Sequence, residues 1–178
     1  MSGALRYSLL AITFGLLVCA VAALHLGVAA ESEVPHVEFN ADNIGPRQIE
    51  DLTAKSVPRD YAFAWQTMEQ ALHENRPGLL DGYFTGTAKQ DLGERVASQN
   101  KSGIHTRYQD RGHELEAIFY APAGDAMQLR DRAQFDLQVL DGNKVIYEEP
   151  VKAEYIVLMT PGADRWMVRQ MQAIGGEK

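Results

Sequence analysis

The chain has 178 residues, with 24 Asp and Glu against 17 Lys and Arg and a formal net charge of −7. This length allows one globular domain with an appendage and excludes two full domains. An acidic chain without a basic stripe excludes sequence-independent binding of nucleic acid, so no nucleic acid is expected as a partner. Its hydrophobic fraction of 46% is an average over one strongly apolar segment and a remainder with enough apolar residues for a small soluble core, which excludes a polytopic membrane protein.

That segment is an apolar run at residues 7–30, which contains no Asp, Glu, Lys or Arg. About 20 apolar residues, at a rise of 1.5 Å each, cross a hydrocarbon core of ~30 Å. The run therefore predicts a single transmembrane helix in an N-terminal anchor, residues 1–30, in contact with the lipid bilayer. The large apolar side chains assigned to this anchor are Leu9, Leu10, Ile12, Phe14, Leu16, Leu17, Val18, Val21, Leu24 and Leu26.

The orientation of this anchor follows from the basic residues on its two sides. Arg6 precedes the run, and the next basic residue is Arg47. The positive-inside rule then places the N-terminus in the cytoplasm of a bacterium and the rest of the chain on the periplasmic side of the inner membrane. An acidic segment next to the membrane also argues against docking on anionic lipid.

Other interpretations of the run stay open. Val28, Ala29 and Ala30 fit the small-residue pattern of a signal-peptide cleavage site, which would release a secreted domain that begins at Glu31. Against this, the apolar part of a signal peptide has about 7–15 residues, and this run is longer. A lipid anchor on Cys19 and a buried core helix are the remaining alternatives. Because Cys19 is the only cysteine, the soluble part contains no disulfide, haem-attachment motif or cysteine-based zinc site.

Residues 31–57 are expected to form an acidic, proline-containing linker, because they show little apolar periodicity. Within them, Val37 and Phe39 alternate with Glu38, a pattern that suits a short strand.

A helical pattern begins at Pro58. Apolar residues follow at spacings of i, i+4, i+7 and i+11, which is one face of a helix: Tyr61, Trp65, Met68 and Leu72. A short helix or turn is predicted at residues 79–84 and a further helix at residues 85–101, which Gly103 ends.

After Gly103 the apolar period changes to two, which predicts strands at residues 113–121, 126–140, 144–159 and 165–174. In the second of these strands, every odd position from 127 to 139 is apolar except Asp131. Residues 141–143 favour a hairpin turn, and Pro150 predicts a bulge or an edge position. Strands of this length exceed the usual 5–6 residues, so the sheet must curl. The predicted fold class is α+β, with a cone-like extracytoplasmic domain at residues 58–178, in which helices pack on a strongly curved antiparallel sheet.

The order of helices and long strands, and the pattern Y-I-V-L-M-T-P-G-A-D-R-W-M-V at residues 155–168, resemble the nuclear-transport-factor-two-like (cystatin-like) superfamily over residues 58–174. Within it, the chain is most similar to the membrane-tethered domains of inner-membrane translocase anchors, plastid-division proteins and type IV secretion scaffolds. This resemblance implies a docking or scaffold role, with the sheet face as the interaction surface. Enzymes of the superfamily use the cone as a pocket, which implies the main alternative.

Eight aromatic residues are candidates for lining a pocket or the core: Tyr61, Trp65, Tyr83, Phe84, Phe119, Phe135, Tyr155 and Trp166. They need no ligand to pack together, although a bound lipid, quinone or pigment is the alternative. His105, His113 and Asp110 are interpreted as polar residues on a solvated strand or loop, with a base or metal pair as the alternative; no third ligand at a recognisable spacing supports a metal. His73 and Glu74 are interpreted as helix-end surface residues.

The candidate docking face comprises Arg130, Arg132, Gln134 and Asp136, which share one side of a predicted strand. Cross-strand pairs are expected between the basic side chains Arg107, Arg130 and Arg132 and the acidic ones Glu114, Glu116, Asp131 and Asp136. No phosphate-binding, nucleophile-elbow or zinc-protease motif occurs, so no catalytic residue and no cofactor are assigned. The expected function is that of a non-enzymatic, membrane-anchored accessory or scaffold subunit, which docks to other subunits of a respiratory, photosynthetic, secretion or division assembly. The alternative is a small-molecule-binding module or an enzyme of the isomerase or dehydratase kind.

Overall fold

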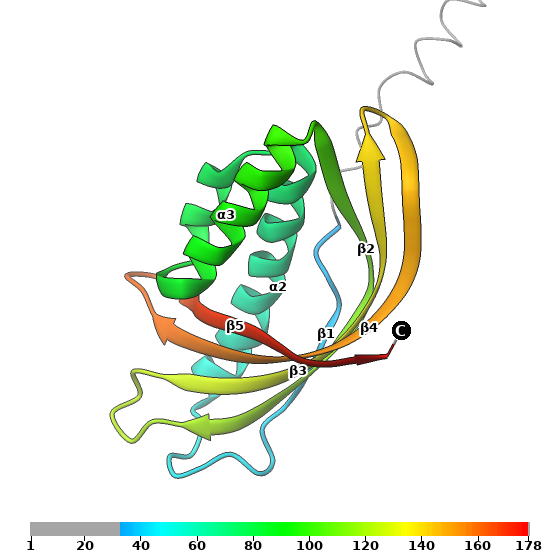
Figure 1. The fold of residues 1–178 in the computed structure, drawn as a ribbon. Helices are drawn as coiled ribbons and strands as arrows, with labels where there is room; N and C mark the ends of the chain where they lie inside the picture. Colours follow the sequence, from blue (N-terminus) through cyan, green and yellow to red (C-terminus); the bar gives the residue numbers. More distant parts are fainter. Residues whose placement is uncertain (1–32, 178) are drawn as a thin grey trace, which may run out of the picture. The chain divides into compact units, whose positions relative to one another are not determined.

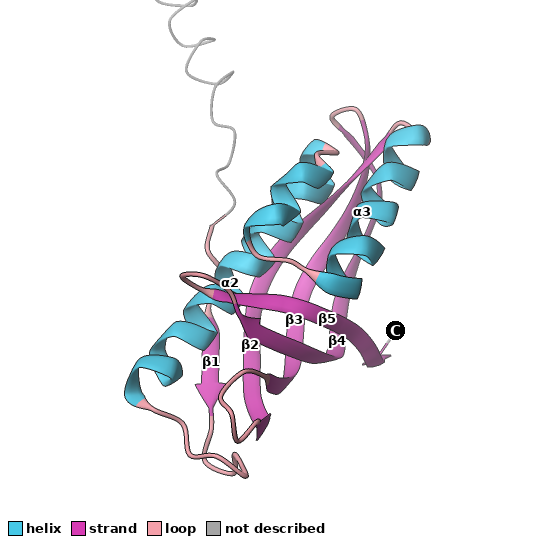
Figure 2. Ribbon diagram, turned by 90° about the vertical axis from the view of Figure 1, so that its left-hand side faces the viewer, coloured by secondary structure: helices cyan, strands magenta, loops and turns pink. Residues whose placement is uncertain are grey.

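The computed structural model describes residues 33–177, which form one five-stranded sheet and two α-helices (Figure 1). In chain order the elements are β1 (Val37–Asn40), α2 (Asp51–Glu74), the 3-10 helix η1 (Pro77–Gly82), α3 (Gly86–Lys101), β2 (Ile104–Tyr120), β3 (Met127–Asp141), β4 (Lys144–Pro161) and β5 (Trp166–Glu177). The strands lie in the order β1-β2-β3-β4-β5. Strands β2 to β5 form an antiparallel meander, and β1 pairs in parallel with β2. Both α-helices lie on one face of the sheet (Figures 1 and 2).

Helix α2 supplies most of the helical contribution to the core, because its apolar residues recur on one face. That face buries Val57, Tyr61, Ala64, Trp65, Met68, Ala71 and Leu72. The helix ends at Glu74, and the left-handed backbone of the next residue, Asn75 (φ 54°), lets the N–H of Arg76 donate to the carbonyl of Ala71 at 3.0 Å. The helix begins at Asp51 rather than at Pro58, because Leu52, Ala54 and Lys55 are good helix formers and Val57 adds buried apolar surface.

Bulges in the long strands let the sheet curl over the helices. In β2, Arg111 is an extra residue between Asp110 and Gly112, which face Phe135 and Gln134 of β3. Gly112 has a φ of 140°, a conformation that an L side chain rarely adopts, so glycine is required at this bulge. A second irregularity in β2 lies between Ala117 and Phe119.

The predicted fold class, a transmembrane helix followed by a cone-like α+β domain with an antiparallel sheet, is wrong. Strands make up 46% of the described residues, and the helical part consists of two α-helices and one 3-10 helix. The short helix or turn predicted at residues 79–84 is the 3-10 helix η1, whose Gly78 and Gly82 do not favour a longer α-helix. The sheet is also mixed rather than antiparallel, because β1 runs parallel to β2.

The N-terminal part of the prediction also changes. Residues 33–177 contain no helix that is both long enough and apolar enough to cross a membrane. The predicted span at 7–30, with its anchor side chains from Leu9 to Leu26, lies outside the described residues. The segment 31–57, expected to be a linker, contains β1 and the first turns of α2. Val37 and Phe39, which suited a short strand, lie in β1 opposite His113 and Leu115 of β2.

Gly86, the first residue of α3, provides a test of this packing. It has a φ of 55°, and a Cβ at this position would lie 2.9 Å from the backbone oxygen of Arg169 in β5. We expect Gly86→Ala to lower the free energy of unfolding by roughly 1–2 kcal/mol or more, measured by urea denaturation. The control is Gly93→Ala in the same helix, where nothing lies within 4 Å of the added Cβ. This variant should be stabilised by up to about 1 kcal/mol, and equal stability of the two variants would contradict the expectation.

Candidate functional site

The centre of the domain contains a polar cluster that joins α2 to the sheet. Tyr61 of α2 donates its hydroxyl to Oδ2 of Asp131 in β3 at 2.7 Å. His113 of β2 donates through Nδ1 to the same carboxylate, at 2.9 Å from Oδ2 and 3.1 Å from Oδ1. Tyr61 and Asp131 are 0% exposed and His113 is 2% exposed. One buried carboxylate therefore holds a helix residue and a strand residue together.

A second carboxylate, Asp110, lies on the other side of the imidazole. Its Oδ1 is 2.9 Å from Nε2 of His113, although the two atoms are not aligned as a hydrogen bond. Residues three apart in an unbroken strand point to opposite faces of the sheet. The extra residue Arg111 reverses this alternation, so Asp110 and His113 reach the same face.

The two carboxylates determine the charge of His113. Burial by itself lowers the pKa of the imidazole, but the short contacts with Asp110 and Asp131, together with the negative charges of these carboxylates, outweigh burial and raise the pKa to about 9. His113 is thus a cation at neutral pH. Burial and the neighbouring Asp131 raise the pKa of Tyr61 well above its ordinary value. A protonated histidine enclosed in this way does not act as a general base at neutral pH.

Glu69 lies on α2, one turn beyond Trp65 and two turns beyond Tyr61. Its carboxyl group adds to those of Asp110 and Asp131 and lies nearer the surface. Burial raises the pKa of its carboxyl to about 7, and the charge of Asp110 adds to this, while Arg107 opposes it. Glu69 therefore takes up or releases a proton close to neutral pH.

Aromatic rings surround the polar cluster. The ring of Trp65 lies 4.5 Å from that of His113, 5.7 Å from Tyr155, 5.8 Å from Phe135 and 6.1 Å from Tyr108, centroid to centroid. Trp65 is 4% exposed, and its indole N–H has no hydrogen-bond acceptor among the described residues. Burial raises the pKa of Tyr155 to about 12, so its hydroxyl stays protonated at neutral pH. Rings at these separations pack against one another as a core does.

The eight aromatic candidates separate into different places. Tyr61, Trp65, Phe135 and Tyr155 lie together around the polar cluster. Tyr83 instead stacks on Phe63 at 5.8 Å, and Trp166 packs against Tyr120 at 6.3 Å. Phe84 is buried and forms a parallel bridge with Val168 of β5. Phe119 is 40% exposed, so it lines neither a pocket nor the core.

The interpretation of His113 as a residue on a solvated strand was wrong, because the bulge turns it into the interior. The sequence carried a signal for this site: Asp131 is the one polar residue at an inner position of its strand, and a buried carboxylate requires partners. His105 does not join the cluster, since its Nδ1 lies 2.9 Å from the backbone oxygen of His73. Glu74 pairs with Arg76 at 2.7 Å, as a surface residue does. Within residues 33–177, no group of three His, Cys, Asp or Glu side chains is arranged to hold a metal ion.

The predicted docking residues lie on the face of the sheet opposite the helices, because they alternate with buried residues of β3. Arg130 contacts Glu116 of β2 at 3.5 Å and Glu154 of β4 at 3.1 Å. Arg132 lies 3.9 Å from Glu114, and Asp136 lies 2.6 Å from Arg111. Gln134 is exposed. The expected pairs of Arg130 with Glu116 and Arg132 with Glu114 are present, whereas Asp131, also expected there, points into the core.

Apolar side chains share this face with the charge pairs. Phe119, Gln128 and Leu158 follow one another across β2, β3 and β4. Ile156 and Leu158 are half-buried and alternate with the buried Val157 and Met159. We define the outer face as the side chains of Glu114, Glu116, Phe119, Arg130, Arg132, Gln134, Asp136, Glu154, Ile156 and Leu158. It combines exposed apolar surface with cross-strand ion pairs, and its four acidic side chains outnumber its two arginines.

Comparison with known proteins relates this chain to others by fold. No protein-family model and no curated protein matches it. Among solved structures, it is similar to the intermembrane space region of the chloroplast protein ARC6, with a TM-score of 0.60 and 10% identity over 71% of this chain and 98% of that one. It also matches Aln2 from a Streptomyces species, with a TM-score of 0.47 and 12% identity over 71% of this chain and 93% of that one. At 10% identity, the similarity to the ARC6 region shows a shared fold.

Proposed function

We propose that this protein is a non-enzymatic accessory or scaffold subunit that docks to other subunits of a larger membrane assembly through its outer face. The observation that carries this proposal is the mixture of side chains on that face, where Phe119 is 40% exposed beside the paired charges of Arg130 and Glu116. In Figures 1 and 2 both α-helices cover the opposite face of the sheet.

This composition suits a protein interface. Aromatic and arginine side chains are enriched at interfaces and supply much of the binding energy. Charges that are already paired within one subunit lose little stabilising free energy when a partner covers them, because each charge keeps its counterion when the surrounding water is displaced. Arg130 keeps Glu116 and Glu154 in this way, and Asp136 keeps Arg111.

The interior of the domain supports a structural rather than a catalytic role. Asp131 and Tyr61 are fully buried and bonded to one another, and the neighbouring His113 carries a proton at neutral pH. The alternative of a small-molecule-binding or isomerase-like domain, with a lipid, quinone or pigment inside it, stays a prediction from the sequence.

We further propose that the domain works on the extracytoplasmic side of a membrane and belongs to the nuclear-transport-factor-two-like superfamily. The uncharged apolar run at residues 7–30 supports the membrane location. The similarity in fold to a region that lies in the intermembrane space of a chloroplast is consistent with it. Respiratory, photosynthetic, secretion and division assemblies remain the candidate hosts.

Site-specific photo-crosslinking in the native cell tests the docking role. A photo-reactive residue at Phe119 of the full chain should give discrete adducts with one or a few proteins. The control is the same residue at the exposed Ala97 of α3, on the other side of the domain. A second substitution, Leu158→Glu, should reduce the adducts at least about fivefold, since it places an unpaired charge within the proposed interface. Adducts of equal yield from positions 119 and 97, or none from 119, would contradict the proposal.

A further inference from the structure

Strand β1 adds one acidic side chain to the side of the sheet that carries the outer face. Val37 and Phe39 pack against the core, so Glu38 between them points to the opposite side. Its register partner in β2 is Glu114. The side chains of Glu38 and Glu114 are 74% and 61% exposed. Two carboxylates therefore lie directly opposite each other on neighbouring strands, an arrangement that destabilises a sheet.

These two carboxylates have weak counterions within the domain. Glu38 pairs with no lysine or arginine of residues 33–177, and its one ionic contact is His36, at 3.8 Å. Glu114 approaches one guanidinium, that of Arg132, at 3.9 Å. Arg130, the next arginine on this side, is already shared between two other carboxylates. The domain therefore leaves negative charge uncompensated at Glu38 and Glu114.

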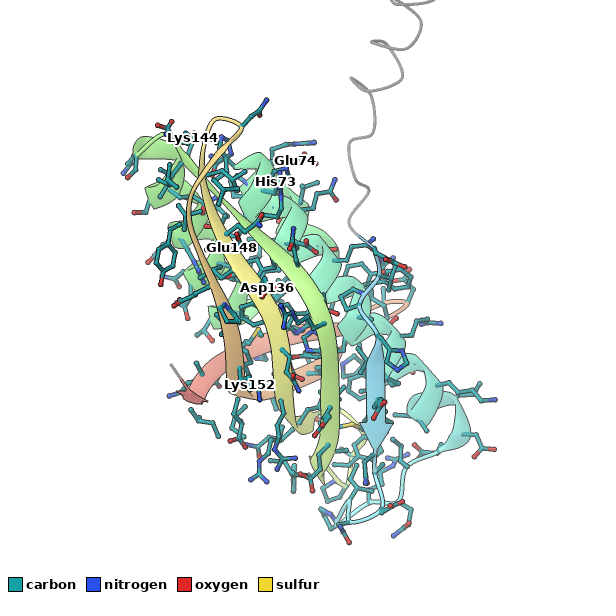
Figure 3. All side chains as sticks on the ribbon, turned by 90° about the vertical axis from the view of Figure 1, so that its right-hand side faces the viewer. His73, Glu74, Asp136, Lys144, Glu148 and Lys152 are labelled. Atoms are coloured by element: carbon teal, nitrogen blue, oxygen red, sulfur yellow. The ribbon has the colours of Figure 1, made fainter. Side chains whose placement is uncertain are left out.

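This excess of negative charge lies over β1 and β2. On β3, Asp136 already has Arg111 as its counterion, at 2.6 Å. On β4, the exposed Lys152 lies opposite Gln134 and adds a positive charge. Figure 3 looks onto this side of the sheet, with Asp136 and Lys152 labelled and β1, in blue, beside β2. The charge of the sheet thus changes from negative at β1 and β2 to balanced or positive at β3 and β4.

Apolar surface follows the acids along β2. Glu114, Glu116 and Phe119 occupy successive positions on the outer side, because the irregularity between Ala117 and Phe119 shifts the alternation by one residue. At ~3.3 Å per residue, Glu114 and Phe119 lie roughly 13–16 Å apart. A single protein surface can therefore cover the uncompensated acids and the exposed ring of Phe119 together.

The uncompensated acids restrict the chemistry of such a partner. A surface that covers Glu38 and Glu114 removes water from both carboxylates, which is unfavourable unless a counterion takes the place of the water. A purely apolar or an acidic surface supplies no counterion, and a bilayer of anionic lipid repels both groups. Lysine or arginine on the partner neutralises the two charges and relieves the repulsion between them.

We propose that the docking partner of the outer face is a protein whose contact surface places lysine or arginine side chains against Glu38 and Glu114 and a large apolar side chain against Phe119. This inference rests on the docking role proposed above and names the chemistry of the partner. The charges select a basic surface and speed its association, while the apolar contact supplies much of the affinity.

Charge reversal of the two acids tests this chemistry in the photo-crosslinking experiment. With the photo-reactive residue at Phe119 of the full chain, the double variant Glu38→Lys, Glu114→Lys should lower the yield of adducts at least about tenfold, because it places basic groups against a basic partner. The control is the double variant Asp91→Lys, Glu94→Lys, at two exposed positions of α3. It changes the net charge by the same amount on the helical side of the domain and should leave the yield unchanged.

A neutral variant separates docking from folding. Glu38→Gln combined with Glu114→Gln should lower the yield of adducts roughly threefold or more, since the partner loses both counterions. Its midpoint of urea denaturation should stay at or above the wild-type value, because the change removes the repulsion between two exposed carboxylates. A loss of stability that accompanies the loss of adducts would make the two acids structural residues and would overturn the proposal.

Mass spectrometry of the wild-type adduct gives a second readout. The partner peptide joined to position 119 should carry lysine or arginine within ~15 Å, which is about five residues of extended chain or ten of helix. An acidic peptide, or adducts that keep their yield after charge reversal, would overturn the basic partner while the docking role stands. Adducts only with lipid or with a second copy of this chain, or none from position 119, would overturn both.

Discussion

Replacement of Asp131 by alanine is expected to lower the free energy of unfolding by about 3–5 kcal/mol. The change removes the carboxylate that accepts hydrogen bonds from both Tyr61 and His113 in a fully buried site. It leaves the buried imidazolium of His113 with one neighbouring carboxylate, Asp110, in place of two. It also leaves the buried hydroxyl of Tyr61 without a hydrogen-bond partner. Urea or thermal unfolding of the full chain, followed by circular dichroism, measures the effect.

Two further variants test whether the loss of stability comes from the buried carboxylate of Asp131 or from any substitution in β3. Asp136→Ala removes a surface carboxylate from the same strand, and its pair with Arg111 should be worth at most about 1 kcal/mol. Tyr61→Phe removes one buried hydrogen bond and should cost about 1–2 kcal/mol. If Asp131→Ala does not fold, Asp131→Asn provides the measurement, because the amide keeps the shape and one acceptor. Stability of Asp131→Asn within about 0.5 kcal/mol of wild type would disprove the role assigned to this carboxylate.

Stability is also expected to fall as the pH rises from neutral to about 10. The pKa of His113 is about 9 in the folded domain, against an ordinary value of 6.5, so the folded state holds this proton more tightly than the unfolded chain. The resulting stabilisation is complete below pH 6.5 and is lost as the pH rises through 9. It amounts to roughly 3 kcal/mol. The groups around the imidazole are Tyr61 on α2, Asp110 on the same strand and Asp131 on β3.

Glu69 adds a change of the same sign at lower pH. Its pKa is raised from 4.5 to about 7, so the folded state again holds the proton more tightly, and stability decreases as the pH rises through this interval. Denaturation midpoints between about pH 5 and 10 measure both steps. Glu69→Gln should flatten the profile below about pH 7 and leave the upper part unchanged, whereas His113→Gln should flatten it between about pH 7 and 9.5. A wild-type profile that is level across this upper interval would disprove the assignment to His113.

The local patterns of the sequence predict much of this domain. The apolar stripe of Tyr61, Trp65, Met68 and Leu72 lies on the buried face of α2, and the turn at residues 141–143 joins β3 to β4. Pro150 lies on the uncovered edge of β4, one of the two positions that its missing N–H allows. Each of these features depends on residues close together in the chain, which is why a sequence pattern reveals it.

The remaining features depend on contacts between distant residues or on a single irregularity. Alternation predicts opposite faces for Asp110 and His113, and only the bulge at Arg111 brings them together. The parallel pairing of β1 with β2 joins residues that are far apart in the chain, such as Val37 and His113. The run at residues 77–82 forms a 3-10 helix where a short α-helix or turn was expected. The sequence nevertheless indicates one residue of the buried polar cluster, because Asp131 is a carboxylate among the apolar residues at the odd positions of β3.

The parallel pairing of β1 has a consequence for synthesis of the chain. Val37 is made long before its partner His113, and His113 in turn requires Asp131. Because His113 also donates its backbone N–H to the carbonyl of His36, the first strand and the buried cation depend on the same few residues of β2. A nascent chain that ends before β3 has therefore neither a complete sheet edge nor the Asp131 counterion for the imidazole. We conclude that β1 gains its strand partner, and His113 its Asp131 counterion, only after β2 and β3 have been synthesised.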